Sequence, residues 1–179
     1  MGFFIGGIVV VTLIVFLLFS KRIFSYIRKL YISRYISGIT IHNIDSLSGR
    51  EFEEFLYYLF INLGFEVTLT KSSHDYGADL ILKVGNVRIA LQCKLYSKHS
   101  VGTSSVQEAY SASKFYNTHI GVVITNSKFS SNAIKLASIT NVLLWDRDML
   151  IKLISAKDSE KSLIRNQVMY TVLSSISTV

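Results

Sequence analysis

The sequence predicts an α/β protein in which helices flank a mixed β-sheet and one transmembrane helix precedes the folded domain. Three patterns indicate this class: an uncharged apolar N-terminus, an amphipathic helix followed by a strand and a tight hairpin, and a later alternation of strands and helices. The strands of a hairpin pair antiparallel, whereas strands separated by a helix pair in parallel. The expected element order of the folded domain is therefore αβββαβαβα.

The N-terminal residues 2–19 (GFFIGGIVVVTLIVFLLF) carry no charge and reach the lower length limit of a membrane span. No basic residue precedes this stretch and no small-residue cleavage motif follows it, which favours a retained anchor over a signal peptide. Basic residues follow at once: Lys21, Arg22, Arg28, Lys29 and Arg34. The positive-inside rule then predicts a single-pass protein of the inner (cytoplasmic) membrane, with the N-terminus outside and the folded domain in the cytoplasm. Residues 2–19 and the basic flank would contact lipid.

Charge and composition suggest four segments. We expect a transmembrane helix at 1–20, a basic juxtamembrane helix and linker at 21–45, a folded domain at 46–155, and a C-terminal tail at 156–179 that is either helical or frayed. The net charge is +7, but the first 44 residues contribute +5 because they contain five basic and no acidic residues, which leaves +2 for the rest. The basic balance thus belongs mainly to the membrane flank and says little about nucleic acid.

The folded domain is expected to begin with a helix. Ser48 and Glu51 form a capping box before an apolar stripe, and Gly64 suits the C-terminal cap. A strand follows at residues 66–70, and a loop leads into the hairpin. The later elements are a helix at 105–116, a strand at 120–125, a helix at 130–139, a strand at 142–145 and a helix at 148–154.

The hairpin turns at Gly85-Asn86, a pair typical of two-residue loops. This turn sets a register in which Asp79 lies opposite Gln92, with Lys94 on the same face. The other face is apolar: Leu80, Leu82, Val84, Val87, Ile89, Leu91 and Cys93. A slip of one residue would mix the two faces, so the polarity supports the register. The single cysteine, Cys93, is therefore expected in the core, and it excludes an internal disulfide.

Two interpretations of the polar face are open. One is a half-exposed hairpin with a cross-strand pair of Asp79 and Lys94. The other is a cation site, because a carboxylate and an amide oxygen suit a hard ion such as Mg²⁺, and a neighbouring lysine can polarise water or stabilise charge on a phosphate. Glu53 lies at the edge of the first helix's apolar stripe and can face the sheet, although the helix dipole also explains an acid there.

Several short motifs occur in order along the chain: Phe52-Glu53, Gly64-Phe65-Glu66-Val67, Asp75-Tyr-Gly-Ala-Asp79, Gln92-Cys-Lys94-Leu-Tyr and Val122-Val-Ile-Thr125-Asn. In this order they resemble the catalytic domain of Mrr-type restriction endonucleases, a branch of the PD-(D/E)xK nuclease superfamily. The resemblance covers residues 46–154. It implies a restriction-endonuclease-like sheet and a metal-dependent DNA endonuclease that uses Mg²⁺, with Mn²⁺ as a substitute.

The resemblance also assigns roles to particular residues. Asp79 matches the metal-binding aspartate, Glu53 the helix glutamate and Lys94 the catalytic lysine. The backbone carbonyl of Cys93 corresponds to a further metal ligand. Gln92 stands where many relatives carry Glu or Asp, and this variant is common in the Mrr branch.

Further residues are expected around this centre. Asp75 matches a secondary acidic position, and Lys94, Lys98 and Gln107 are the expected DNA contacts. The family analogy also implies a homodimer and a role in restricting foreign DNA. The alternative is a non-cleaving DNA-binding or membrane-tethering module that retains the nuclease fold. A third hypothesis is a protein-interaction or membrane-structural protein.

Overall fold

The computed structural model describes residues 16, 20, 23–24, 26–27, 30–36, 38–70, 76–96 and 99–177. Residues 30–36 are helical and lead to α2 (Ile41–Asp45) and α3 (Gly49–Asn62). The capping box predicted for α3 is present, because the Ser48 backbone N–H donates to Glu51 Oε2 at 2.7 Å and the Glu51 N–H donates to Ser48 Oγ at 3.3 Å. A second capping box, from Thr40 and Asn43, starts α2, which the sequence analysis did not predict.

Five strands form one sheet in the order in which they occur along the chain: β1 (Glu66–Leu69), β2 (Leu80–Val84), β3 (Val87–Lys94), β4 (Ile120–Thr125) and β5 (Leu143–Trp145). The pairs β1–β2 and β2–β3 are antiparallel, and the pairs β3–β4 and β4–β5 are parallel. The remaining helices are α4 (Thr103–Phe115), α5 (Ser131–Thr140), α6 (Arg147–Ile154) and α7 (Lys161–Ser177). The prediction of a mixed sheet flanked by helices is therefore confirmed.

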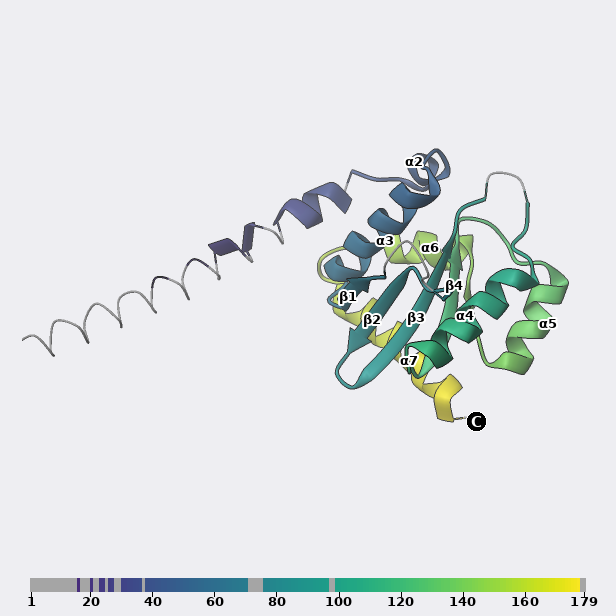
Figure 1. The fold of residues 1–179 in the computed structure, drawn as a ribbon. Helices are drawn as coiled ribbons and strands as arrows, with labels where there is room; N and C mark the ends of the chain where they lie inside the picture. Colours follow the sequence, from purple (N-terminus) through teal and green to yellow (C-terminus); the bar gives the residue numbers. More distant parts are fainter. Residues whose placement is uncertain are drawn as a thin grey trace, which may run out of the picture.

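Helices cover both faces of the sheet (Figure 1). The apolar face of the hairpin packs with α3, α6 and α7 in the largest core cluster, and the predicted hairpin register is confirmed from Val84↔Val87 to Leu80↔Leu91. The opposite face, which carries Ala90, packs against α4 and α5 in two smaller clusters. One of the two interpretations made this face half exposed, but α4 crosses it as the connection that parallel pairing of β3 and β4 requires.

The large core cluster extends beyond both ends of residues 46–155. Ile32 and Ile36 from the N-terminal helical segment are buried in it. Val168 and Val172 from α7 are also buried there, so the C-terminal segment is a packed helix from Lys161 to Ser177.

The expected membrane span, residues 2–19, lies almost wholly outside the described residues. Within the part of the chain that is described, no helix combines the length and apolar character needed to cross a bilayer. This finding contradicts the prediction of a single-pass inner-membrane protein, which is withdrawn. The prediction depended on the apolar run and its basic flank in the sequence.

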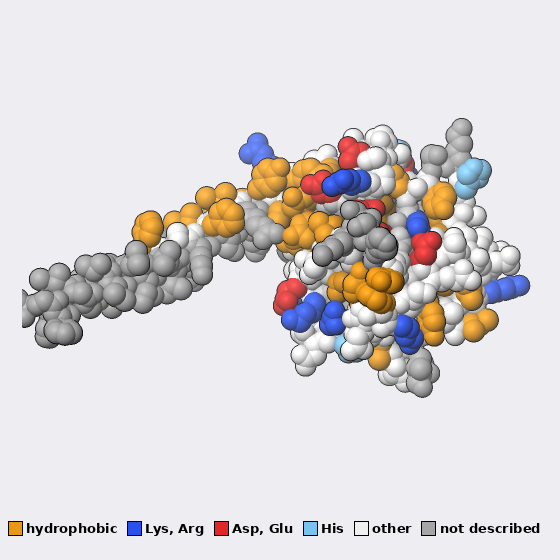
Figure 2. Space-filling view, viewed as in Figure 1, with side chains coloured by type: hydrophobic (Ala, Val, Ile, Leu, Met, Phe, Trp, Pro, Cys, Tyr) orange, Lys and Arg blue, Asp and Glu red, His pale blue; other side chains and the backbone are white. Residues whose placement is uncertain are grey.

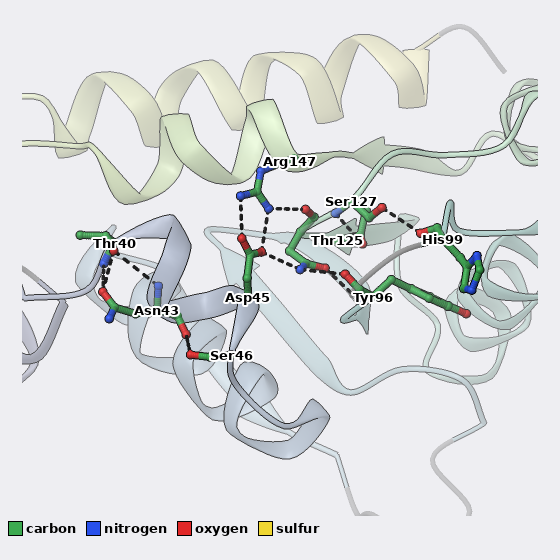
Figure 3. Close-up of polar contacts among 10 residues, drawn as sticks. Thr40, Asn43, Asp45, Ser46, Tyr96, His99, Thr125, Ser127 and Arg147 are labelled. Carbon is green, nitrogen blue, oxygen red and sulfur yellow. Dashed lines mark hydrogen bonds and ion pairs between the residues drawn. The ribbon is translucent and has the colours of Figure 1, made fainter.

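A polar cluster joins the C-terminal ends of β3 and β4 to two helices (Figure 3). Asn126, directly after β4 and only 3% exposed, accepts from the Tyr96 N–H at 2.9 Å and donates to the Tyr96 carbonyl at 3.0 Å. Its amide also donates to Asp45 at the end of α2, at 2.9 Å. Arg147 in α6 binds both Asp45 oxygens at 2.7 Å and the Asn126 carbonyl at 2.8 Å. This cluster fixes the chain two residues beyond Lys94.

Candidate active site

Gly77, just before β2, lies directly on α4. Gly77 has φ +91°, and a Cβ atom there would come within 2.6 Å of the Glu108 carbonyl oxygen. Only glycine allows both this backbone conformation and this close approach. The loop then leads to Asp79, whose N–H donates to the Leu91 carbonyl at 2.9 Å and whose carbonyl accepts from the Thr70 N–H at 3.0 Å.

The Asp79 carboxylate is held by two donors from β3. Its Oδ2 accepts from Gln92 Nε2 at 2.7 Å and from the Cys93 backbone N–H at 2.6 Å. Gln92 is 5% exposed, so this contact is shielded from water. Gln92 therefore positions the aspartate as a hydrogen-bond donor, a part that a second carboxylate could play only when protonated.

Lys94 ends β3 and reaches α4. Its Nζ lies 2.7 Å from Glu108 Oε2, and the two side chains are 26% and 40% exposed. Burial acts to lower the pKa of Lys94, but the hydrogen bond and charge of Glu108, together with the charge of Asp79, outweigh it and raise the pKa. The lysine is therefore a fixed cation beside Asp79.

Glu53 approaches the same neighbourhood from α3. It is partly buried, and its charge acts on the thiol of Cys93. Burial is the main cause that raises the pKa of this thiol well above its ordinary value, followed by the charges of Asp79 and Glu53. Cys93 is thus a buried, protonated thiol, as expected for a core residue, and both carboxylates lie near it.

The donor set suits a hard cation rather than a soft one. Asp79, Glu53 and the Cys93 carbonyl supply oxygen atoms, which Mg²⁺ and Mn²⁺ prefer. The N–H and C=O groups of a strand residue point to the same side, so the Cys93 carbonyl faces the side of Asp79. Among residues 38–70, 76–96 and 99–177, no group of three or more His, Cys, Asp and Glu residues is close enough to hold a metal. A bound ion would therefore keep several water ligands.

The other predicted residues are less well defined. Asp75 and Lys98 lie outside the described residues. Gln107 is exposed on α4, next to Glu108. Sequence reasoning missed Glu108, although it is the only acidic residue between Asp79 and Asp146, which could have singled it out.

Taken together, the mixed sheet, its helices on both faces and the Asp–Gln–Lys group at the end of the hairpin define a restriction-endonuclease-like nuclease domain. The model of the restriction endonuclease family Mrr_cat matches residues 44–154, more than half of the chain, and the chain belongs to this family. No curated protein matches the chain significantly.

Three solved structures are similar in fold. The DNA modification-dependent restriction endonuclease AspBHI is 20% identical, with a TM-score of 0.48 over 85% of this chain and 40% of that chain. The MspJI restriction endonuclease, solved with a 27-mer oligonucleotide, is 18% identical, with a TM-score of 0.41 over 86% and 34%. AF1548, a protein of unknown function, is 19% identical, with a TM-score of 0.46 over 52% and 55%. The chain thus spans 55% or less of the length of each of these proteins.

Proposed function

We propose that this chain is a divalent-metal-dependent DNA endonuclease that hydrolyses phosphodiester bonds and acts in restriction of foreign DNA. The observation that carries the proposal is the contact of Asp79 with Gln92 and the Cys93 N–H at 2.7 and 2.6 Å, beside the cation of Lys94. A carboxylate oriented by two donors and a fixed ammonium group are the elements that hydrolysis of a phosphodiester needs. Membership of the restriction endonuclease family supports the same activity.

Each residue has a distinct part in this proposal. Asp79, Glu53 and the Cys93 carbonyl would hold Mg²⁺ or Mn²⁺, which when bound lowers the pKa of a ligated water and polarises the phosphate. Gln92 keeps the Asp79 carboxylate in place. The Lys94 ammonium group neutralises charge that develops on the phosphate oxygens.

The outer residues and the larger organisation are part of the same proposal. Lys94, Lys98 and Gln107 contact DNA phosphates, and Asp75 is a secondary acidic residue of the site. The nuclease domain corresponds to residues 46–155. A single site cuts one strand at a time, so cleavage of both strands at one position would use a homodimer.

The test is nicking of supercoiled plasmid by the full chain with Mg²⁺, with Mn²⁺ and with EDTA. Asp79→Asn keeps the size of the side chain and removes its charge, and Lys94→Ala removes the ammonium group. Lys83→Ala is the matched control, because Lys83 is an exposed lysine on the same hairpin, paired with Glu66 near the turn. We expect metal-dependent nicking by the parent and the control, and a loss of at least a hundredfold in both site variants. Nicking that persists in both would refute the assigned site.

Two observations favour a second candidate function, a DNA-binding module that does not cleave. Gln92 replaces a carboxylate, and the described residues hold no cluster of three acidic, histidine or cysteine ligands. Weaker metal binding is the expected consequence. Retention of plasmid DNA in a gel, without product at millimolar Mg²⁺ or Mn²⁺, would select this alternative.

A further inference from the structure

Two aromatic rings are stacked on the surface near the candidate active site. Tyr76, in the loop before Asp79, and Phe115, the last residue of α4, have ring centroids 3.7 Å apart and planes inclined by 17°. Each of them is 55% exposed. In Figure 2, hydrophobic side chains gather on the surface over the sheet beside α4. Large rings that pack together in solvent commonly mark a binding surface.

Both rings of the stack are carried by residues in contact with the rest of the fold. Tyr116 packs against Phe115 at 5.0 Å with planes at 86°, and it also joins a small cluster of buried alanines beneath α4. Tyr76 has φ +48°, an uncommon conformation for a residue with a side chain, and the next residue, Gly77, is pressed against α4. The backbone conformation of Tyr76 and the contact of Gly77 with α4 therefore restrict the position of the Tyr76 ring.

The stack lies close to the residues of the candidate site. Glu108 and Phe115 are seven residues apart on α4, which places them on one side of the helix about 10 Å apart along its axis. Glu108 contacts Lys94, and Tyr76 lies three residues before Asp79. A ring surface at this distance from Lys94 is within the reach of one or two nucleotides.

The exposed side of α4 has the chemistry of a nucleic-acid-binding surface. It presents Gln107, Tyr110, Ser111, Lys114 and Phe115. Lys114 Nζ lies 5.3 Å from the centroid of the Tyr110 ring. The helix contains one acidic residue, and Lys94 neutralises it. Rings supply stacking faces, and an interleaved lysine supplies a phosphate contact.

We propose that the Tyr76–Phe115 stack binds an unpaired base of single-stranded DNA beside the candidate active site, with Lys114 contacting a phosphate of the same strand. The ligand is an unpaired strand because both faces of a base inside a duplex are covered by its neighbours. The choice of DNA rests on the proposed function, whereas the binding surface is tested independently of cleavage.

The experiment measures binding of the full chain to a fluorescein-labelled twenty-residue oligothymidine and to a duplex of equal length, in EDTA so that no metal-dependent cleavage occurs. Tyr76→Leu and Phe115→Leu remove the aromatic faces and keep apolar bulk, whereas Tyr76→Phe keeps the ring. Tyr170→Leu is the matched control, because it removes a 77% exposed ring from α7. We expect about tenfold weaker oligothymidine binding for each of the two leucine variants at the stack, less than about threefold for the duplex, and parent-like binding for Tyr76→Phe and Tyr170→Leu.

Equal oligothymidine binding by the parent and both leucine variants at the stack would overturn the proposal, as would failure of the parent to bind. Equal weakening of duplex and oligothymidine binding in the leucine variants would indicate a folding defect and would also overturn the proposal. Plasmid nicking by a parent whose leucine variants bind normally would leave the nuclease function intact and remove the stacking surface. If the parent never nicks DNA but its leucine variants selectively lose oligothymidine binding, the stacking surface is supported and the nuclease function is refuted.

Discussion

Replacement of Asp45 by alanine should destabilise the fold far more than the loss of an ordinary surface charge. The Asp45 carboxylate accepts from Arg147 Nη1 and Nη2 at 2.7 Å each and from Asn126 Nδ2 at 2.9 Å. These contacts tie α2 and α6 to the end of β4, and through Asn126 to Tyr96 after β3. The substitution therefore breaks the contacts by which α2 holds both α6 and the end of β4.

The magnitude follows from the number of bonds and their exposure. A hydrogen bond to a charged group contributes about 1.5–3 kcal/mol when buried. Asp45 and Arg147 are 35% and 31% exposed, so water replaces much of what is lost. We expect a net loss of about 2 kcal/mol, which lowers the Tm of a chain of this size by about 4–8 °C.

The loss should depend on pH in a definite direction. The hydrogen bond from Arg147, opposed by burial and supported by Asn126, holds the pKa of Asp45 below its ordinary value. A lowered folded-state pKa stabilises the protein above the unfolded-state pKa of about 3.9, and this stabilisation is lost as pH falls through the folded-state value. The difference in Tm between the parent and Asp45→Ala should thus be constant from pH 8 to about pH 5 and shrink below about pH 4.

Thermal unfolding followed by circular dichroism measures both effects. Glu66→Ala is the control, because Glu66 forms a more exposed pair with Lys83 at 3.2 Å, which should contribute less than about 0.5 kcal/mol. Equal losses in the two variants, or a loss for Asp45→Ala that persists unchanged at pH 3, would refute the reasoning.

Three further substitutions test the contacts of α4. Gly77→Ala would place a methyl group 2.6 Å from the Glu108 carbonyl at φ +91°, so we expect a loss of about 2–3 kcal/mol in chemical unfolding and slower plasmid nicking. Gly121→Ala would press a methyl group against the backbone of α4, so we expect it to destabilise the fold at least as much as Gly77→Ala, measured as a lower Tm. Gly49 has open space around it, so Gly49→Ala should leave Tm within about 2 °C. Glu108→Gln removes the charge that raises the pKa of Lys94, so the pH at which an amine-directed reagent labels this lysine should move downward, as measured by mass spectrometry.

The sequence predicted the hairpin well because its two faces differ in polarity. One face of the hairpin is apolar at every position on both sides of Gly85-Asn86, and only one register keeps those residues together. The same pattern placed Gln92 and Lys94 with Asp79. The regular ladder ends at Leu80, however, and the bonds of the Asp79 backbone and carboxylate beyond that point could not be read from alternation.

The missed features are mostly contacts between distant segments. The pairing of Lys94 with Glu108 depends on how the crossover helix lies on the sheet, which periodicity does not specify. The burial of Ile32 and Ile36 likewise depends on packing against the rest of the core. The short α2 helix is different, because Thr40 and Asn43 form a local capping box that could have been recognised in the sequence.

The two sides of β3 differ in how soon they can acquire a partner during folding. On one side, β2 joins through a two-residue turn, whereas on the other β4 follows only after the connection of residues 95–119. Closing the longer connection costs more chain entropy and is slower. Asp79 and Gln92 should therefore meet early, and Lys94 should acquire its partner on α4 late. Asn126→Ala should then mainly accelerate unfolding and leave the refolding rate nearly unchanged, which stopped-flow kinetics would measure.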